Sequence, residues 1–438
     1  MRVCLIAYDF PPLNSGGSHR PLRFCRYLEE NSIEPVVFTL SSYDEGARID
    51  EGLCDKLPPN LEIHRSQMRE PSFLESPAFG RYFQLSDSLG RRWEPGLKAS
   101  LERAWSREPW EAVVVTAPPF SLLRLGAWAA KRFGVPLVSD MRDGWSLWCI
   151  TPYASWLHYA LTRFWEGHWL TRSDAVLVPT LGVLDDMKSQ HARLDQRLHY
   201  IPNGFDGDIS DDVRPLEVLP KDSLTIGYAG SFYFNPYSHK LLHSAWYTKK
   251  PYQYLQYVPR LEDWSYRSPL YFLKAIKELF NLDIRWRGKI KLRIAGTQPP
   301  AIHRMVEDME MQDTVDFVGF LAKEDLPSFY EDCDYALSTS IKLENGRDYC
   351  IAGKTYECVE LGVPMLGFVC EGSQKDFLAS SGLAVLFDPD QAKMNAHRLQ
   401  ELIRKGRKFE PNIEFLRQFN PSETTKKLTD VLQGIRRA

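Results

Sequence analysis

The stretch Gly353-Lys-Thr-Tyr-Glu-Cys-Val-Glu-Leu-Gly-Val-Pro364 lies between two short apolar runs, 335–338 and 364–368. Its composition predicts a short helix that begins near Gly353 and ends at Gly362, since glycine commonly caps the C-terminus of a helix. A strand, a helix and a second strand in this order form the βαβ unit of parallel sheets. This unit predicts an α/β fold for the half of the chain that contains it.

The same alternation of apolar runs and helical segments extends through the rest of the chain. In the second half we predict strands over 224–229, 290–295, 315–318, 335–338, 364–368 and 384–387. In the first half we predict strands over 2–8, 35–39, 112–116, 136–139, 175–178 and 199–201, and helices over 18–30, 120–133 and 154–171. With 438 residues, the chain is longer than a single core usually grows. We therefore predict an α/β fold with two Rossmann-like, doubly wound domains that face each other across a cleft.

The boundary between these domains is predicted at a charged stretch that contains proline. We assign residues 1–205 to the N-terminal domain, 206–223 to a linker and 224–438 to the C-terminal domain, whose last helix can pack back on the N-terminal domain. Residues 232–266 interrupt the pattern because they are rich in tyrosine, tryptophan, lysine and histidine without a clear period. They form either an ordered surface excursion or a contact with an acceptor or membrane surface.

Composition excludes several functional classes. Because 54 basic residues nearly balance 57 acidic ones, the chain has no overall charge that favours nucleic acid. The apolar run at the N-terminus stops at Asp9, and no segment is apolar over the length of a membrane span. The cysteines lack zinc-binding spacing, so we expect reduced thiols and no metal. These features predict a cytoplasmic protein that is soluble or peripheral at the inner face of the membrane.

The predicted helix start at Gly353 has the groups of a diphosphate site. The backbone amides there, the Lys354 ammonium and the Thr355 hydroxyl can all meet an anion. Glu357 lies one turn further on the same face, where its carboxylate can accept hydrogen bonds from ribose hydroxyls. The competing interpretation is that Lys354 and Glu357 are ordinary surface residues.

Two further C-terminal residues are candidates for the same anion. Ser231 follows the strand 224–229 within Tyr-Ala-Gly-Ser, where small residues let the backbone meet an oxyanion. Arg267 is placed at the start of the helix after the excursion and can supply a positive charge, although a solvated arginine explains it equally well.

In the N-terminal half, Gly16 and Gly17 precede a predicted helix. Paired glycines allow a phosphate or sugar to approach the backbone, or they simply form a tight turn. The loop does not match the dinucleotide pattern of dehydrogenases. Asp140, Arg142 and Asp143 follow the strand 136–139. They form ion pairs of Arg142 with Asp140 or Asp143, or else Arg142 or Asp143 contacts the transferred sugar or positions the acceptor hydroxyl.

In their order and spacing, these segments resemble the GT-B glycosyltransferases close to glycosyltransferase family four. The resemblance rests on Pro-Pro-x-x-x-Gly16-Gly17, Thr116-Ala-Pro-Pro-Phe-Ser, Asp140-Met-Arg-Asp-Gly-Trp, Glu166 ahead of Arg172-Ser-Asp-Ala-Val, Pro202-Asn-Gly-Phe-Asp, Tyr228-Ala-Gly-Ser, Val318-Gly-Phe and Lys354-Thr-Tyr-Glu with Gly362-Val-Pro. It implies that the C-terminal domain holds the nucleotide, with the ribose on Glu357 and the base near Val318, Gly319 and Phe320. The phosphates would meet Ser231, Lys354, Thr355 and Gly16 or Gly17.

The chain departs from the family pattern at two places. Residues 140–143 stand where family members often have a catalytic histidine, and no histidine is present there. The family also commonly has an earlier glutamate that reaches the sugar, but the matching position is Tyr349, with Glu344 and Asp348 as nearby candidates on the preceding loop.

The resemblance implies transfer of a sugar from a nucleoside-diphosphate sugar to an acceptor hydroxyl, without a metal or other cofactor and mostly with retention. It implies a role in polysaccharide, lipopolysaccharide or other glycoconjugate synthesis, with a glycan, a lipid-linked molecule or a small molecule as acceptor. Two alternatives remain: a sugar-nucleotide epimerase or hydrolase of the same fold, and a non-catalytic subunit that binds nucleotide sugars.

Overall fold

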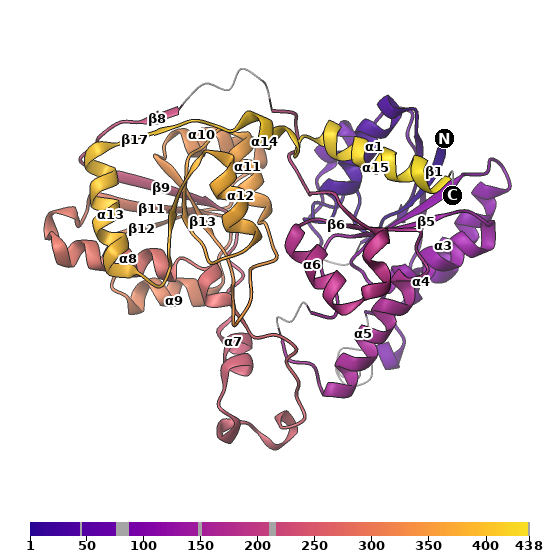
Figure 1. Ribbon diagram of the computed structural model, residues 1–438, viewed down its shortest axis with the longest axis horizontal. Helices are drawn as coiled ribbons and strands as arrows, with labels where there is room; N and C mark the ends of the chain where they lie inside the picture. The colour runs from indigo at the N-terminus through magenta and orange to yellow at the C-terminus, as the bar shows by residue number, and fades with distance from the viewer. Residues whose placement is uncertain (44–45, 76–86, 148–150, 210–215, 437–438) are drawn as a thin grey trace.

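The computed structural model describes residues 1–43, 46–75, 87–147, 151–209 and 216–436. Two parallel sheets form the centres of two lobes that lie side by side (Figure 1). Residues 210–215, which belong to the predicted linker, lie outside the described ranges, and so does Cys149. In those ranges, no helix is long and apolar enough to cross a bilayer.

The N-terminal sheet has the strand order β3-β2-β1-β4-β5-β6-β7, and every pairing in it is parallel. Its strands are β1 (Arg2–Ile6), β2 (Glu34–Leu40), β3 (Glu62–Ser66), β4 (Ala112–Ala117), β5 (Leu137–Met141), β6 (Ala175–Val178) and β7 (Leu198–Tyr200). Its main helices are α1 (His19–Leu28), α3 (Leu89–Trp105), α4 (Leu122–Phe133), α5 (Trp156–Leu170) and α6 (Leu181–Gln190).

Alternate side chains of β1 pack into two separate cores, as expected for a strand that is buried on both faces. Val3 and Leu5 pack with α1 and with the C-terminal helix α15 (Pro421–Arg436). Cys4 and Ile6 pack on the opposite face, in the core that contains apolar side chains of α3 and α4. Helices therefore cover both faces of the sheet, which confirms the doubly wound prediction.

The C-terminal sheet is also parallel, in the order β12-β11-β9-β13-β15-β16. Its strands are β9 (Leu224–Ala229), β11 (Ile290–Ala295), β12 (Val315–Gly319), β13 (Tyr335–Thr339), β15 (Met365–Phe368) and β16 (Ala384–Phe387). Its helices are α8 (Leu270–Leu282), α9 (Pro300–Asp308), α10 (Leu326–Glu331), α11 (Gly353–Glu360), α12 (Ser373–Ser381) and α13 (Ala392–Lys405).

The two lobes are joined by the linker and by the C-terminal end of the chain. Within the linker, β8 (Leu216–Val218) pairs antiparallel with β17 (Arg407–Phe409) of the C-terminal domain. The chain then passes through α14 (Ile413–Arg417) into α15, which packs against α1. The C-terminal helix thus packs on the N-terminal domain, as the sequence allowed.

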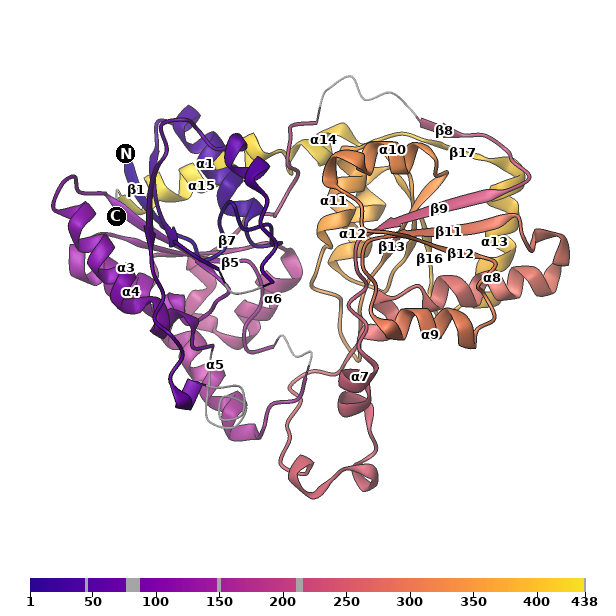
Figure 2. The same ribbon diagram turned by 180° about the vertical axis from the view of Figure 1, so that it is seen from behind.

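The excursion after β9 contains α7 (Pro236–His243), short 3-10 turns and β10 (Glu262–Asp263). Strand β10 pairs antiparallel with β14 (Lys342–Leu343), so the end of the excursion is anchored to its own domain. Figure 2, a view from behind, shows α7 and the loop that follows it extending below the C-terminal lobe. Arg267 closes a 3-10 turn, Trp264–Arg267, and α8 begins only at Leu270, which corrects the predicted helix start.

Candidate active site

The loops at the carboxyl ends of the two sheets face each other across the domain boundary. Thr180, which caps α6, donates its hydroxyl hydrogen to the carbonyl oxygen of Tyr349 in the opposite domain. Nearby, Arg260 Nη1 lies 2.6 Å from Asp186 Oδ2. These contacts hold the two predicted halves of the site in one arrangement.

The Lys354 ammonium lies against Gly230 at the end of β9. A Cβ atom on Gly230 would overlap Nζ and Cε of Lys354, and the φ of Gly230 is +124°, a conformation that other residues rarely adopt. Lys354, Arg267 and Tyr228 line the same small pocket in front of α11. Arg267 and Lys354 are therefore brought together beside Gly230, whereas the Ser231 hydroxyl donates to the carbonyl oxygen of Thr297 and its phosphate role stays a prediction.

Two cations in this pocket have no carboxylate partner among the described residues. Both cations lie over aromatic rings: Lys354 Nζ is 5.5 Å from the ring centre of Tyr228, and the Arg267 guanidinium is 5.3 Å from that of Tyr233 and 5.7 Å from that of Trp264. Burial lowers the pKa of Lys354, and the nearby Glu357 opposes this change. Half-buried positive charges without partners are unfavourable unless an anion joins them, so the pocket is suited to a diphosphate.

Helix α11 presents its first turn to this pocket, with Gly353 exposed. The Thr355 side chain has a different environment: its Oγ1 accepts a hydrogen bond from Gln374 Nε2 and lies 3.3 Å from Ser338 Oγ. The Thr355 amide also donates to the carbonyl oxygen of Ala352. Since both groups are already satisfied within the domain, phosphate contact by Thr355 stays a prediction that the geometry does not favour.

The predicted nucleotide-base residues lie at the outer edge of the same sheet. Val318 and Phe320 are 37% and 76% exposed, and Gly319 has a φ of +86° at the end of edge strand β12. Glu357 is half-buried, and no described protein group forms a hydrogen bond or ion pair with its carboxylate. The apolar surface and the unpaired carboxylate are both available to a nucleoside, but their roles stay predictions.

Across the boundary, Gly17 lies against the Arg142 side chain. A Cβ on Gly17 would overlap the Arg142 guanidinium and the Asp9 carboxylate, whereas Gly16 faces open space. Arg142 Nη2 donates to Asp9 Oδ2 at 2.7 Å and to the carbonyl oxygen of Pro118. Gly17 thus has a packing reason to be glycine, and the phosphate roles of Gly16 and Gly17 stay predictions.

Of the two alternatives for residues 140–143, the ion pairs of Arg142 with Asp140 or Asp143 are not formed. Asp140 is 1% exposed and pairs with Arg20 of α1, whose Nε lies 3.0 Å from both carboxylate oxygens. Arg142 pairs with Asp9 instead of either neighbour. Sequence reasoning missed both partners, because nothing local links them to the strand end. The available signal was that the predicted helix 18–30 contains basic residues, Arg20 among them, that could pair with these carboxylates.

Asp143 is the carboxylate of this loop that faces the opposite domain. Burial raises its pKa to about 6, while Arg142 and Arg267 oppose that change. Asp143 is half-buried, and no hydrogen bond to its side chain is present within the described part of the chain. Of the three predicted catalytic residues, Asp143 is the one whose carboxylate forms no hydrogen bond or ion pair within the described ranges, and it lies near enough to Arg267 for that charge to oppose the rise of its pKa.

Tyr349, at the position of the missing glutamate, is part of the domain interface. Its side chain is buried under the Arg260 guanidinium, which lies 4.2 Å from the ring centre. Asp348 is buried, accepts a hydrogen bond from the Cys350 amide, and has a pKa raised to about 7 by burial. Glu344 is exposed at the other end of the loop. Tyr349 therefore cannot replace the missing glutamate, and a sugar contact by Glu344 or Asp348 stays a prediction.

Comparison with known proteins assigns both halves of the chain. Residues 15–204 match the family model described as "Glycosyl transferase 4-like domain". Residues 243–415 match the model described as "Glycosyl transferases group 1". The two matches are separated at the domain boundary of the structure.

Relatives were found among curated proteins and solved structures. Alpha-monoglucosyldiacylglycerol synthase of Streptococcus pneumoniae is 22% identical over 310 residues, which are 66% of this chain and 62% of that protein, so the chain matches less than two thirds of it. A glycosyltransferase from Rickettsia africae superposes with a TM-score of 0.57 at 10% identity, covering 99% and 98% of the chains. HepE of Anabaena, solved with UDP and glucose, superposes with a TM-score of 0.53 at 12% identity, covering 100% of this chain and 97% of that one.

Proposed function

Because this chain belongs to the GT-B glycosyltransferases that are similar to glycosyltransferase family four, we propose that it transfers a sugar from a nucleoside-diphosphate sugar to an acceptor hydroxyl. The observation that carries the proposal is the pair of unpaired cations, Lys354 and Arg267, in the pocket before α11. Retention of anomeric configuration and a role in glycoconjugate synthesis belong to the same proposal.

The chemistry requires a place for the charge that develops on the leaving nucleoside diphosphate. When the bond between the anomeric carbon and the phosphate oxygen breaks, Lys354, Arg267 and the amides at the start of α11 would meet the negative charge in a site shielded from water. In this proposal these groups take the place that a divalent metal has in other transferases. Glu357 would bind the ribose, and Val318 to Phe320 the base.

The acceptor side is proposed to lie at the end of β5. Asp143 would accept a hydrogen bond from the acceptor hydroxyl, and Arg142, held by Asp9, would fix the loop that carries it. Asp140 is then a positioning residue, since its carboxylate is fully engaged by Arg20.

A lipid-linked acceptor is supported by the outer surface of α5. Trp156, Leu157 and Phe164 are 60%, 57% and 58% exposed there, next to Arg163. Aromatic and basic side chains together are typical of helices that lie on an anionic bilayer. The relative from Streptococcus pneumoniae is named as a glucosyldiacylglycerol synthase, which agrees with such an acceptor.

The test is a screen of the purified protein against nucleoside diphosphates and their sugars by thermal shift, followed by product analysis with acceptors. A ligand that binds the folded state raises the melting temperature. Transfer to an acceptor supports the proposal, and formation of free sugar or of an epimerised donor would favour the hydrolase or epimerase alternative. Binding without any turnover would indicate a non-catalytic subunit, and no binding at all would contradict the proposal.

A further inference from the structure

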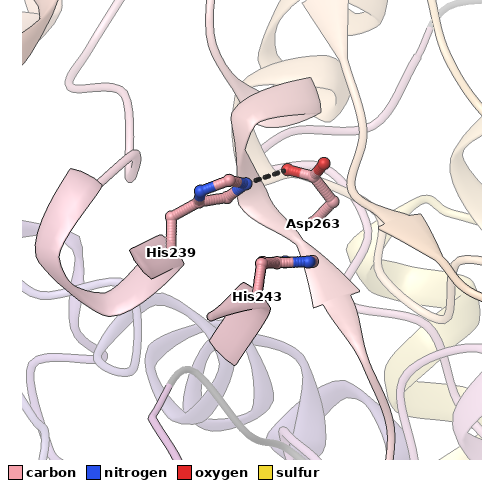
Figure 3. A group of neighbouring side chains, drawn as sticks. All are labelled: His239, His243 and Asp263. Atoms are coloured by element: carbon pink, nitrogen blue, oxygen red, sulfur yellow. Dashed lines mark ion pairs between the residues drawn. The ribbon is translucent and has the colours of Figure 1, made fainter. Parts of the chain in front are cut away.

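Three potential metal ligands gather at the base of the excursion, outside the phosphate pocket. His239 and His243 project from α7, and Asp263 lies on β10 (Figure 3). One ligand atom from each of the three residues lies within 4.8 Å of the others. The two elements are brought together although they are separated by most of the excursion.

The side chains are arranged on one face as a metal site requires. Residues four apart on a helix point the same way, and the two imidazole rings stack with centres 4.3 Å apart. His239 Nε2 lies 3.1 Å from Asp263 Oδ1. His243 Nε2 lies 3.2 Å from the carbonyl oxygen of Glu262, a contact of the kind that orients a histidine ligand.

We propose that His239, His243 and Asp263 bind a divalent transition-metal ion, with Zn²⁺ as the best match. Imidazole nitrogens with one carboxylate oxygen are a common Zn²⁺ ligand set, whereas Ca²⁺ and Mg²⁺ prefer oxygen ligands alone. His243 is exposed and the other two ligands are half-buried, so an ion can reach the site from solvent with water as its remaining ligand.

The ion would cross-link the two ends of the excursion. It would join α7 to β10, which is itself paired with β14, and so close the loop over residues 244–261. Asp263 also accepts hydrogen bonds from the amide and hydroxyl of Ser265, so its carboxylate is already held in place. The site is separate from the proposed transfer chemistry, which uses no metal, and either proposal can fail without the other.

The alternative is that a His239–Asp263 ion pair with a stacked His243 is sufficient without an ion. Calorimetric titration of chelator-treated full-length protein with ZnCl₂ separates the two cases. We expect one Zn²⁺ per chain, and at least a tenfold weaker affinity for His243→Ala and for Asp263→Asn. His397→Ala, which removes an exposed histidine on α13, is the matched control and should bind as the wild type does.

Co²⁺ absorption provides a readout that does not depend on stability or activity. The wild type and His397→Ala should show the visible bands of a nitrogen- and oxygen-ligated Co²⁺, and His243→Ala should lose them. Zn²⁺ should also slow proteolysis within residues 244–261 in the wild type and in His397→Ala, but not in His243→Ala. Absence of saturable Zn²⁺ binding, or equal binding by wild type and His243→Ala, would overturn the site.

Discussion

The Lys354 side chain lies directly against the backbone of Gly230, so the start of α11 and the end of β9 form one surface. The two residues come from sheet-edge loops that are far apart in the sequence. Their contact is possible because Gly230 has no Cβ and adopts a positive φ. The Gly230 amide itself donates to the carbonyl oxygen of Ala295, so the group that can meet a phosphate oxygen here is the Lys354 ammonium.

Replacing Lys354 with alanine tests this surface. We expect Lys354→Ala to weaken nucleoside diphosphate binding at least tenfold and to lower kcat/KM, because an unpaired, partly desolvated cation would be lost from the leaving-group site. The melting temperature without ligand should stay unchanged or rise, since no ion pair of Lys354 is removed. Calorimetry and initial rates measure these effects.

Lys393→Ala is the control for this experiment, because it removes an exposed lysine on α13 far from β9. Equal donor affinity in Lys354→Ala and Lys393→Ala would remove Lys354 from the phosphate site.

Asp143 predicts a pH dependence with a definite sign. Its pKa is about 6 in the folded chain against an ordinary value of 3.8, so the folded state holds the proton more tightly. The free energy of unfolding should therefore fall as pH rises from about 4 to 6, by roughly 1–2 kcal/mol for a half-buried carboxylate. Denaturant unfolding at several pH values should show this fall, and Asp143→Asn should reduce it.

Asp143 also predicts that activity rises with pH over the range in which the free energy of unfolding falls. If the ionised Asp143 accepts the acceptor hydroxyl's hydrogen bond, kcat/KM should rise with pH through about 6 in the wild type. Asp143→Asn should lower kcat and weaken this dependence of kcat/KM on pH, while donor affinity is retained. A variant that keeps the wild-type profile would show that Asp143 has no part in the reaction.

The sequence was sufficient for elements with strong local patterns. The strands predicted over 224–229, 290–295 and 384–387 match β9, β11 and β16. The last is a continuous apolar run, and 290–295 alternates apolar and charged residues, so both carry a clear strand pattern. Strand β3 was missed, since Glu62 and Arg65 interrupt its apolar pattern at the sheet edge. Helix α3 was missed as well, and it contains Pro95, a residue that normally indicates a break.

The site was predictable only in part, because the partners of its side chains come from segments that are distant in the sequence. The motif at Lys354 and Glu357 predicted a helix that matches α11, while the phosphate and ribose roles of these two residues stay predictions. The partners of Asp140 and Arg142 were not predictable, because Arg20 and Asp9 approach them only through the sheet topology. The His239–Asp263 contact likewise depends on how the excursion folds, for which the sequence has no periodic signal.

The Arg20–Asp140 pair predicts a large stability effect. Both side chains are almost fully buried, and Arg20 Nη1 also donates to the carbonyl oxygens of Ile201 and Pro202. Because Arg20→Met leaves the Asp140 charge buried without its partner, we expect a loss of about 3–5 kcal/mol in the free energy of unfolding.

The control for the buried pair is Glu102→Gln, which removes one partner of the exposed Arg132–Glu102 ion pair. Such surface pairs contribute about 0–1 kcal/mol, so this variant should unfold almost as the wild type does. Similar unfolding free energies for Arg20→Met and Glu102→Gln would contradict the structural role assigned to Arg20.

The exposed face of α5 predicts binding to anionic membranes. The double variant Trp156→Ser with Phe164→Ser removes two large apolar side chains that are more than half exposed, and it should reduce co-flotation with vesicles of anionic phospholipid at least threefold. Tyr237→Ser with Tyr254→Ser, which removes exposed aromatics from the excursion, is the matched control for α5. If the control pair causes the larger loss, the excursion is the membrane contact. If neither pair changes flotation, or the wild type does not float, the peripheral membrane contact is ruled out and a soluble acceptor is favoured.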